Sequence, residues 1–265
     1  MRERFILIGL FLLAFALRVY RLDAQSIWWD EGISLHLATS SPAEIIADRA
    51  ANIHPPLYFF VLKVWVALTG ISVFSARFFS VLASLLLVVG VFALAKRWFG
   101  QPTAWLSASF AAFSPLSVVY AQEIRAYALL PLVYLALLFV TREVTRNPEP
   151  ENRAWWLLLG VVETVGLHLH YMVLFAVAYV GIWFLLAFTL ERRWADLRRW
   201  VITQLAVGLV SLPWLLVVLT RWSDVVARTQ IGRGLVEPVR LGYLLRQVWV
   251  FHLTGLSGIA GRGDV

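Results

Sequence analysis

The sequence predicts an all-α, polytopic integral membrane protein of about seven transmembrane helices, with interfacial helices in its first outer loop. Of its 265 residues, 60% are hydrophobic and only 15% are charged, which leaves too few polar side chains to cover a water-soluble globule of this size. The apolar residues come in runs of about sixteen to twenty or more, separated by short charged clusters, as repeated bilayer crossings require. The 13 Trp residues suit the two membrane interfaces, where aromatic side chains accumulate.

Charge and cysteine content exclude several classes of site. The formal net charge is +7, yet the basic residues lie beside the ends of apolar segments and not on one face of a soluble domain. This placement favours a topology signal beside anionic lipid over a nucleic-acid interface. The chain has no cysteine, which excludes disulfides, thiolate metal sites and thiol nucleophiles.

Basic clusters predict the orientation in the membrane. Short basic loops stay in the cytoplasm, and the clusters at residues 96–97, 142–153 and 192–199 each stand between two apolar segments. With the arginines at residues 2–4, they place the N-terminus inside and the C-terminus outside. A cleaved signal peptide is the alternative for residues 5–17, but the membrane segments that follow favour an uncleaved first helix. The expected crossings are residues 5–21, 76–95, 103–121, 126–141, 154–170, 171–190 and 200–220.

The apolar stretch at residues 55–70 is expected to lie in the interface without crossing the bilayer. It has only about fifteen residues, short of a full span, and Lys63 stands at its middle. A crossing here would also move the basic residues 96–97 to the outside, against the charge rule. A helix in the interface plane, with its lysine extended to the headgroups, satisfies all three facts.

Residues 22–75 then form one long extracytoplasmic loop. Ser41 and Glu44 stand at capping-box spacing, which predicts a helix that begins there. The domain organisation that follows is a seven-helix membrane module at residues 1–220. Residues 221–265 are expected to be an outer loop that begins a longer C-terminal region.

The first candidate site is the acid pair Asp30 and Glu31, directly after the first predicted helix. Anionic headgroups repel a carboxylate at the membrane surface, so an acid there needs a reason. A carboxylate in this position can take a proton from an incoming hydroxyl or hold a cation. The alternative is a solvated loop pair beside two interfacial tryptophans, since acids are common in loops.

Further polar residues fall on the same predicted outer side. Arg77 opens the second expected helix, residues 122–125 close the third, and His168 and His170 fall at the outer end of the fifth. Arginine is the side chain best suited to grip phosphate in a planar, bidentate way. Each arginine alone can instead extend to lipid headgroups, and each histidine alone is more often structural.

Two other polar features stand out in apolar surroundings. His54 is followed by two prolines, which stiffen the chain and suit the first turn of a helix, so this histidine is a candidate binding residue or part of a rigid turn. Glu163 lies within the fifth expected helix. An ionisable residue at that depth is by default functional or partnered.

Taken in order, short motifs along the chain resemble the pattern of glycosyltransferase family 39. This family belongs to the GT-C superfamily, includes the dolichyl-phosphate-mannose protein mannosyltransferases, and is close to the lipid A aminoarabinose transferases. The resemblance runs over about residues 10–220. The motifs are Trp-Trp-Asp-Glu at 28–31, His-Pro-Pro-Leu-Tyr at 54–58, Ala-Arg-Phe-Phe-Ser at 76–80, Ser-Pro-Leu at 114–116, Gln-Glu-Ile-Arg-Ala-Tyr at 122–127 and Leu-His-Tyr at 169–171.

The resemblance implies a membrane glycosyltransferase that takes a sugar from a polyprenyl-phosphate-linked donor and passes it, with inversion, to a hydroxyl of a protein, lipid or glycan. Asp30 matches the acid that deprotonates the acceptor, and Glu31 completes the pair. Arg77 and Arg125 match arginines near the donor phosphate. Residues expected to line the same cavity are His54, Tyr58, Gln122, Glu123, Tyr127 and His170.

The resemblance makes no cofactor certain, and a divalent metal is possible because some relatives place one near the positions of His54 and His170. The expected partners are the polyprenyl-phosphate sugar, the bilayer and the acceptor, with no nucleic acid. The expected location is the plasma membrane, with the site on the extracytoplasmic side. Two alternatives are a non-catalytic carrier or flippase subunit for lipid-linked sugars, which has no need of the Asp-Glu pair, and an inert assembly subunit.

Overall fold

The computed structural model describes residues 2–146 and 153–230, and every regular element in these ranges is helical. The chain divides into two compact units, which are described separately. Among the described residues, the first unit holds residues 2–39, 62–132 and 228–230, and the second holds residues 40–61, 133–146 and 153–227. Three of the divisions fall within helices, namely α4 (Leu57–Thr69), α8 (Leu130–Arg146) and α11 (Trp194–Gln230).

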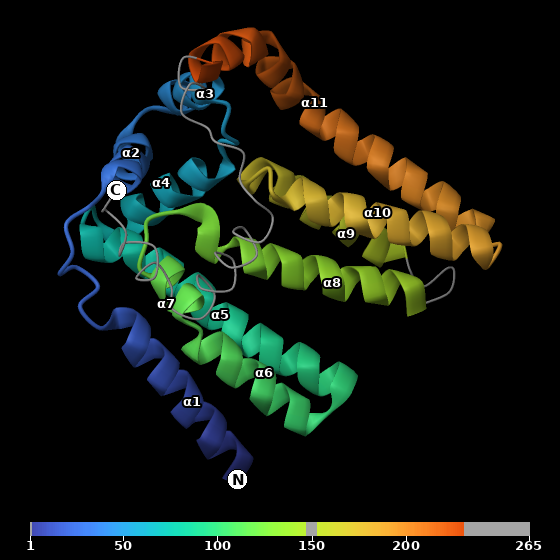
Figure 1. Cartoon of the computed structure of the whole chain (residues 1–265), viewed down its shortest axis with the longest axis horizontal. Coiled ribbons are helices and arrows are strands. Elements are labelled where there is room, and N and C mark those ends of the chain that lie inside the picture. The colour runs from blue at the N-terminus through green and yellow to red at the C-terminus, as the bar shows by residue number, and fades with distance from the viewer. Residues whose placement is uncertain (1, 147–152, 231–265) are drawn as a thin grey trace, which may run out of the picture. The chain divides into compact units, whose positions relative to one another are not determined.

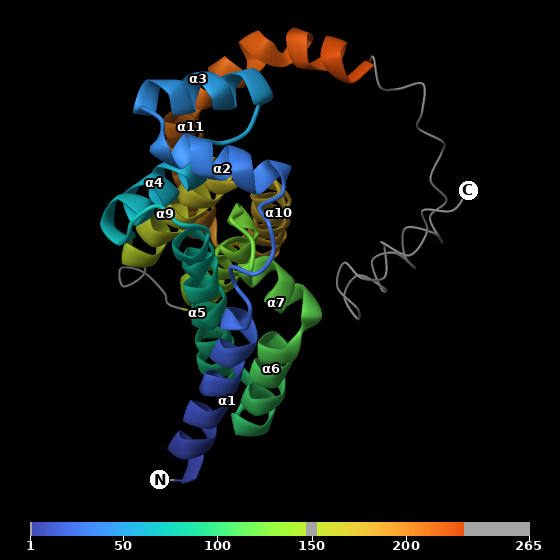
Figure 2. The same cartoon turned by 90° about the vertical axis from the view of Figure 1, so that its left-hand side faces the viewer.

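The first unit is built on three helices that lie side by side in both views (Figures 1 and 2). These are α1 (Arg2–Val19), α5 (Val73–Phe99) and α6 (Gln101–Phe113). The buried face of α6 presents Ala104, Ala108 and Ala112, each fully buried and four residues apart. Such small side chains let membrane helices approach closely. The unit also contains α2 (Trp29–Thr39), α7 (Pro115–Ala121) and the short η1 (Ala126–Ala128).

The third expected crossing is a broken helix, because α6 and α7 meet at an angle of 53°. Pro115 cannot donate a backbone hydrogen bond, and the Ser114 side chain caps α7. The fully buried guanidinium of Arg18 donates to the carbonyls of Ala111 and Ala112 at 3.0 and 2.9 Å. It thereby satisfies the carbonyl groups that the break leaves without helical partners.

The second unit packs α8, α9 (Arg153–Leu169) and α10 (Val173–Leu190) around an apolar core. Phe184 and Phe188 are fully buried and stack with ring centroids 5.0 Å apart. The helices come so close at Gly166 that a Cβ atom there would lie 2.6 and 2.8 Å from two valine methyl groups. The unit also contains α3 (Pro42–Asn52) and most of α11 (Trp194–Gln230).

The all-α prediction is confirmed for the described residues, and the apolar helices make the chain a multi-pass membrane protein. Within the described part of the chain, four helices are long and apolar enough to cross a membrane, or five if the bent pair of α6 and α7 is one span. The expected crossings at α1 and α9 are outside that set, so the count of seven stays a prediction. The helix α4 is apolar but shorter, and its interfacial placement is also still a prediction.

Two predicted helix starts have different outcomes. The capping box is confirmed at α3, where the Ser41 side chain accepts from the backbone of Glu44 and the Glu44 carboxylate accepts from the backbone of Ser41. The last expected helix was placed six residues too late, because α11 begins at Trp194. Asp196 accepts a hydrogen bond from Arg193 at 2.8 Å and stabilises this extra turn. The helix also passes residue 220, and residues 231–265 of the predicted outer region lie outside the described residues.

Candidate active site

The candidate site begins at the N-terminus of α2, whose first turn carries Asp30 and Glu31. The backbone N–H of Gly32 donates to Trp28, and the Ser34 hydroxyl donates to the carbonyl of Asp30 at 2.9 Å. Unpaired N–H groups at a helix N-terminus favour negative charge, so this turn suits two carboxylates. The two side chains nevertheless differ in surroundings, because Glu31 is fully buried and Asp30 is partly exposed.

Glu31 forms a bidentate ion pair with Arg77 of α5. Its Oε1 accepts from Nε of the arginine at 2.9 Å, and its Oε2 accepts from Nη2 at 2.7 Å. The Glu31 carboxylate also accepts from the backbone N–H of Ile124 at 3.0 Å. A buried carboxylate is tolerated when it is paired and hydrogen-bonded in this way. Glu31 therefore ties α2, α5 and the segment after α7 to one point.

The remaining donors of Arg77 are also used inside the protein. Its Nη1 donates to the carbonyls of Leu22 and Gln25 at 2.8 and 3.1 Å, in the segment between α1 and α2. Only 3% of the residue is exposed. These contacts do not fit the phosphate-binding role expected for Arg77, because no N–H group of its guanidinium faces an open space. They fit a residue that orders the first loop around Glu31.

Residues 122–125 form the short connection between α7 and η1. The Gln122 side chain donates to the carbonyls of Arg18 and Tyr20 at 3.1 Å each, so it caps the end of α1 and does not point away from the protein. The Ser80 hydroxyl donates to the carbonyl of Glu123 at 2.6 Å. Contacts on both sides therefore fix the backbone that carries Glu123 and Arg125.

Asp30 and Arg125 are the more exposed partners in this site. Asp30 Oδ2 lies 3.5 Å from Arg125 Nη1, and the two side chains are 32% and 15% exposed. The guanidinium of Arg125 also donates to the Tyr127 hydroxyl at 3.2 Å and lies over that ring, 5.2 Å from its centroid. A partly exposed acid next to a partly exposed arginine can act on a ligand, whereas the buried pair beneath it cannot.

The Glu123 carboxyl is the fifth ionisable group of this site. Burial and the nearby Glu31 carboxylate raise its pKa to about 7, against the opposing effect of the two arginines. Its Oε2 atom is buried and has no hydrogen-bond partner among the described residues. The protonated and ionised forms of Glu123 are therefore close in free energy at neutral pH.

The structure thus brings together seven of the residues that the sequence singled out, all in the first unit. His54, Tyr58 and His170 belong to the second unit, and their place beside Asp30 stays a prediction. Within that unit, His54 contacts the carbonyl of Asn52 at 2.8 Å, and His170 Nδ1 accepts from the backbone of Met172 at 3.1 Å. The seven residues are Asp30, Glu31, Arg77, Gln122, Glu123, Arg125 and Tyr127.

Among the side chains that the structure describes, at residues 4–146 and 153–221, no three His, Asp or Glu residues group closely enough to hold a metal ion. The histidine pair expected near a metal therefore offers no ligand set on which a step can be built. Sequence reasoning also missed Arg18, which supports the segment leading to this site. An arginine inside the apolar first helix was the available signal, because a charge at that depth needs partners.

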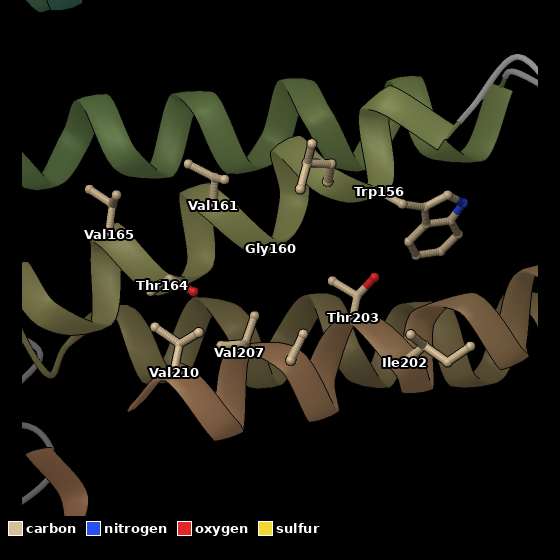
Figure 3. A pocket seen from close by; sticks show the side chains of 11 residues that line it. Trp156, Gly160, Val161, Thr164, Val165, Ile202, Thr203, Val207 and Val210 are labelled. Atoms are coloured by element: carbon tan, nitrogen blue, oxygen red, sulfur yellow. The ribbon is translucent and has the colours of Figure 1, made fainter. Parts of the chain in front are cut away.

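A separate apolar pocket lies in the second unit, between α9 and α11 (Figure 3). Its volume is about 410 Å3, and its walls are almost entirely aliphatic. Gly160 lets α9 and α11 approach closely, because a Cβ atom there would lie 3.3 Å from the Thr203 methyl group. The pocket carries none of the acids or arginines described above.

Comparison with known proteins places the chain in a family. The family model for dolichyl-phosphate-mannose-protein mannosyltransferase matches residues 53–218. This range includes Arg77, Glu123 and Arg125 and begins after Asp30 and Glu31. A search of curated proteins finds no match to the chain. Because the family model covers more than half of the sequence, the protein belongs to the dolichyl-phosphate-mannose-protein mannosyltransferase family and is a membrane glycosyltransferase of the GT-C kind.

Proposed function

We propose that the chain transfers a sugar from a polyprenyl-phosphate-linked donor to a hydroxyl of a protein, lipid or glycan, with inversion at the anomeric carbon. The observation that supports this most strongly is the pair of Asp30 and Arg125, which is partly exposed above a buried ion pair. Transfer from a lipid phosphate needs a base for the acceptor and a cation for the leaving group. In this pair, Asp30 can supply the base and Arg125 can supply the cation.

In this proposal Asp30 is the general base. The acceptor oxygen attacks the anomeric carbon while its proton passes to the Asp30 carboxylate. The bond between the anomeric carbon and the phosphate oxygen breaks, and the electron pair leaves with the prenyl phosphate. Asp30 lies in the first turn of α2, where the N–H groups of the helix N-terminus favour negative charge, which suits this role.

Arg125 is the arginine that we assign to the phosphate. It is 15% exposed and lies beside Asp30, so it can stabilise the charge that develops on the leaving group. Arg77 is assigned a positioning role, since its donors are used by Glu31 and by carbonyl groups of the first loop. Glu31 shares that role and does not act as a second base. Tyr127 orients Arg125 through its hydroxyl and ring.

The remaining predictions from the sequence, on location, further site residues and family relation, belong to the same proposal. The site faces the extracytoplasmic side of the plasma membrane, where the basic loops orient it. His54, Tyr58 and His170 remain proposed substrate-contacting residues. The family relation extends to glycosyltransferase family 39 and, more distantly, to the lipid A aminoarabinose transferases.

The test is a transfer assay on the whole chain in liposomes, with a polyprenyl-phosphate hexose labelled in the sugar. A labelled product with a new glycosidic bond, formed together with prenyl phosphate, is the expected result. Movement of the labelled lipid between leaflets with no glycosidic product would instead identify a carrier. Two controls measure the background. Liposomes without protein lack the catalyst, and protein-containing liposomes with a prenyl ether of the sugar lack the phosphate leaving group.

A further inference from the structure

The charges of the candidate site do not balance. We call Asp30, Glu31, Arg77, Glu123 and Arg125 the five-residue cluster. Its two ion pairs, between Glu31 and Arg77 and between Asp30 and Arg125, use both arginines. Glu123 is the third acid of the cluster, and it forms no ion pair in the described residues.

The Oε2 atom of the Glu123 carboxyl has no hydrogen-bond partner among the described residues. The Glu123 backbone is fixed by the Ser80 hydroxyl on one side and by the pairing of Ile124 with Glu31 on the other. Its Oε2 atom is buried but meets no donor or acceptor among the described residues. A buried polar atom without a partner costs free energy, and at a site of this kind it suggests that the partner is a ligand atom.

We propose that Glu123 is kept protonated and donates its O–H to a phosphate oxygen of the lipid-linked donor, next to Arg125. The cluster then carries no net charge before the donor binds, and Arg125 together with the Glu123 hydroxyl forms a pair of donors for the phosphate. This inference rests on the proposed function, because it names how the donor of that reaction is held.

The charged groups around Glu123 have opposing effects on its ionisation. The carboxylates of Asp30 and Glu31 on α2 oppose its ionisation, whereas Arg77 on α5 and Arg125 on its own segment favour it. Tyr120 on α7 lies close enough to interact with it electrostatically. Burial adds to the effect of the carboxylates, and together they outweigh the arginines, so the pKa is raised to about 7. An ionised Glu123 would place a third anion beside Arg125 when a phosphate arrives.

The sign of the pH dependence follows from the protonated form being the binding form. Glu123 carries its proton below a pH of about 7 and loses it above. Donor binding should therefore be tightest below neutral pH and weaken as the pH rises. Over the range from about pH 6 to about pH 8.5, the loss should be about thirtyfold, as linkage to one proton requires.

The experiment measures binding of monomethyl farnesyl phosphate, a prenyl phosphodiester, to the full chain in detergent micelles by titration calorimetry. A diester keeps one negative charge across this range, so its own titration does not enter. The variants are Glu123→Gln, which is neutral at every pH, and Glu191→Gln, the same change at an exposed position that ends α10. Farnesyl methyl ether measures binding that needs no phosphate.

The expected result has two parts. Wild-type protein and Glu191→Gln lose affinity as the pH rises, and the wild-type protein takes up a proton on binding near pH 8. Glu123→Gln binds with nearly constant affinity and holds the diester more tightly than the wild type at about pH 8.5. A damaged fold cannot produce that gain, so the comparison separates the hydrogen bond from a structural effect.

Three results would overturn the inference. If the affinity of the wild type for the diester does not change with pH, or if the affinity of Glu123→Gln declines as that of the wild type does, the protonation of Glu123 does not control binding. The proposed function would still stand. If the diester binds no better than farnesyl methyl ether at any pH, the phosphate is not recognised, and the proposed donor falls with the role of Glu123.

Discussion

The carboxylate of Glu31 accepts two hydrogen bonds from the guanidinium of Arg77, at 2.9 and 2.7 Å, in a pair that is almost fully buried. The same carboxylate receives the N–H of Ile124, and the same guanidinium holds the carbonyls of Leu22 and Gln25. This arrangement links the first loop, α2, α5 and the segment after α7. The two acids therefore differ in their surroundings: Glu31 is buried in a structural ion pair, whereas Asp30 is partly exposed and is the proposed base.

Breaking this ion pair should destabilise the protein strongly. Glu31→Gln leaves the Arg77 charge buried without its counterpart, and we expect a loss of about 3–5 kcal/mol in the free energy of unfolding. Denaturant unfolding in mixed micelles measures it. Arg97→Gln, at the exposed end of α5, serves as the control and should change stability by less than about 0.5 kcal/mol. Equal effects at the two positions would argue against a structural ion pair.

The double variant Glu31→Gln with Arg77→Met tests the coupling between the two residues. Because it removes both charges together, it should lose less stability than the sum of the two single variants. Strict additivity would show that the pair does not act as a unit.

Replacing Arg125 should affect donor use more than folding. Arg125→Ala removes the partly exposed guanidinium beside Asp30, and we expect kcat/KM for the lipid-linked donor to fall by about ten- to a hundredfold, in line with loss of one charged contact. Arg125→Lys keeps the charge but not the planar shape, and it should retain an intermediate activity. Unchanged kinetics in both variants would place phosphate recognition elsewhere.

Close helix packing at Gly166 gives a prediction for the second unit. Gly166→Ala places a methyl group 2.6 and 2.8 Å from Val173 and Val133, and the strain should cost about 1–3 kcal/mol. Gly208→Ala is the matched control, because no atom lies within 4 Å of the added carbon and alanine favours a helix. Thermal unfolding of the two variants should move in opposite directions, and a loss of stability at Gly208 alone would contradict this packing.

Much of the fold followed from the sequence, because hydropathy and charge placement are local properties. The capping box at Ser41 and Glu44 was predictable for the same reason, since both partners lie within one turn. The start of α11 was missed because the rule that puts basic clusters in cytoplasmic turns ignores that Asp196, in the first turn of α11, can pair with Arg193 just before the helix.

The sequence predicted that Asp30, Glu31, Arg77 and Arg125 would lie close together. It did not predict which of these side chains would be buried in structural contacts. Motif spacing brought Asp30, Glu31, Arg77 and Arg125 to the same side of the membrane. It could not show that the guanidinium of Arg77 donates its hydrogen bonds to Glu31 and to loop carbonyls, because that depends on contacts between residues about fifty positions apart. The support from Arg18 was missed for the same reason, since its partners lie on α5, α6 and α7.

The most direct measurement is the rate of sugar transfer by Asp30→Asn in liposomes, compared with Asp23→Asn. Both changes remove one carboxylate from residues 22–39, and Asp23 is exposed and takes no part in the hydrogen bonds and ion pairs of the five-residue cluster in the described structure. We expect Asp30→Asn to lose at least about a hundredfold in turnover while it still binds the donor, as loss of a general base implies, and Asp23→Asn to remain near the wild-type rate. Near-normal turnover of Asp30→Asn would contradict the account at its centre.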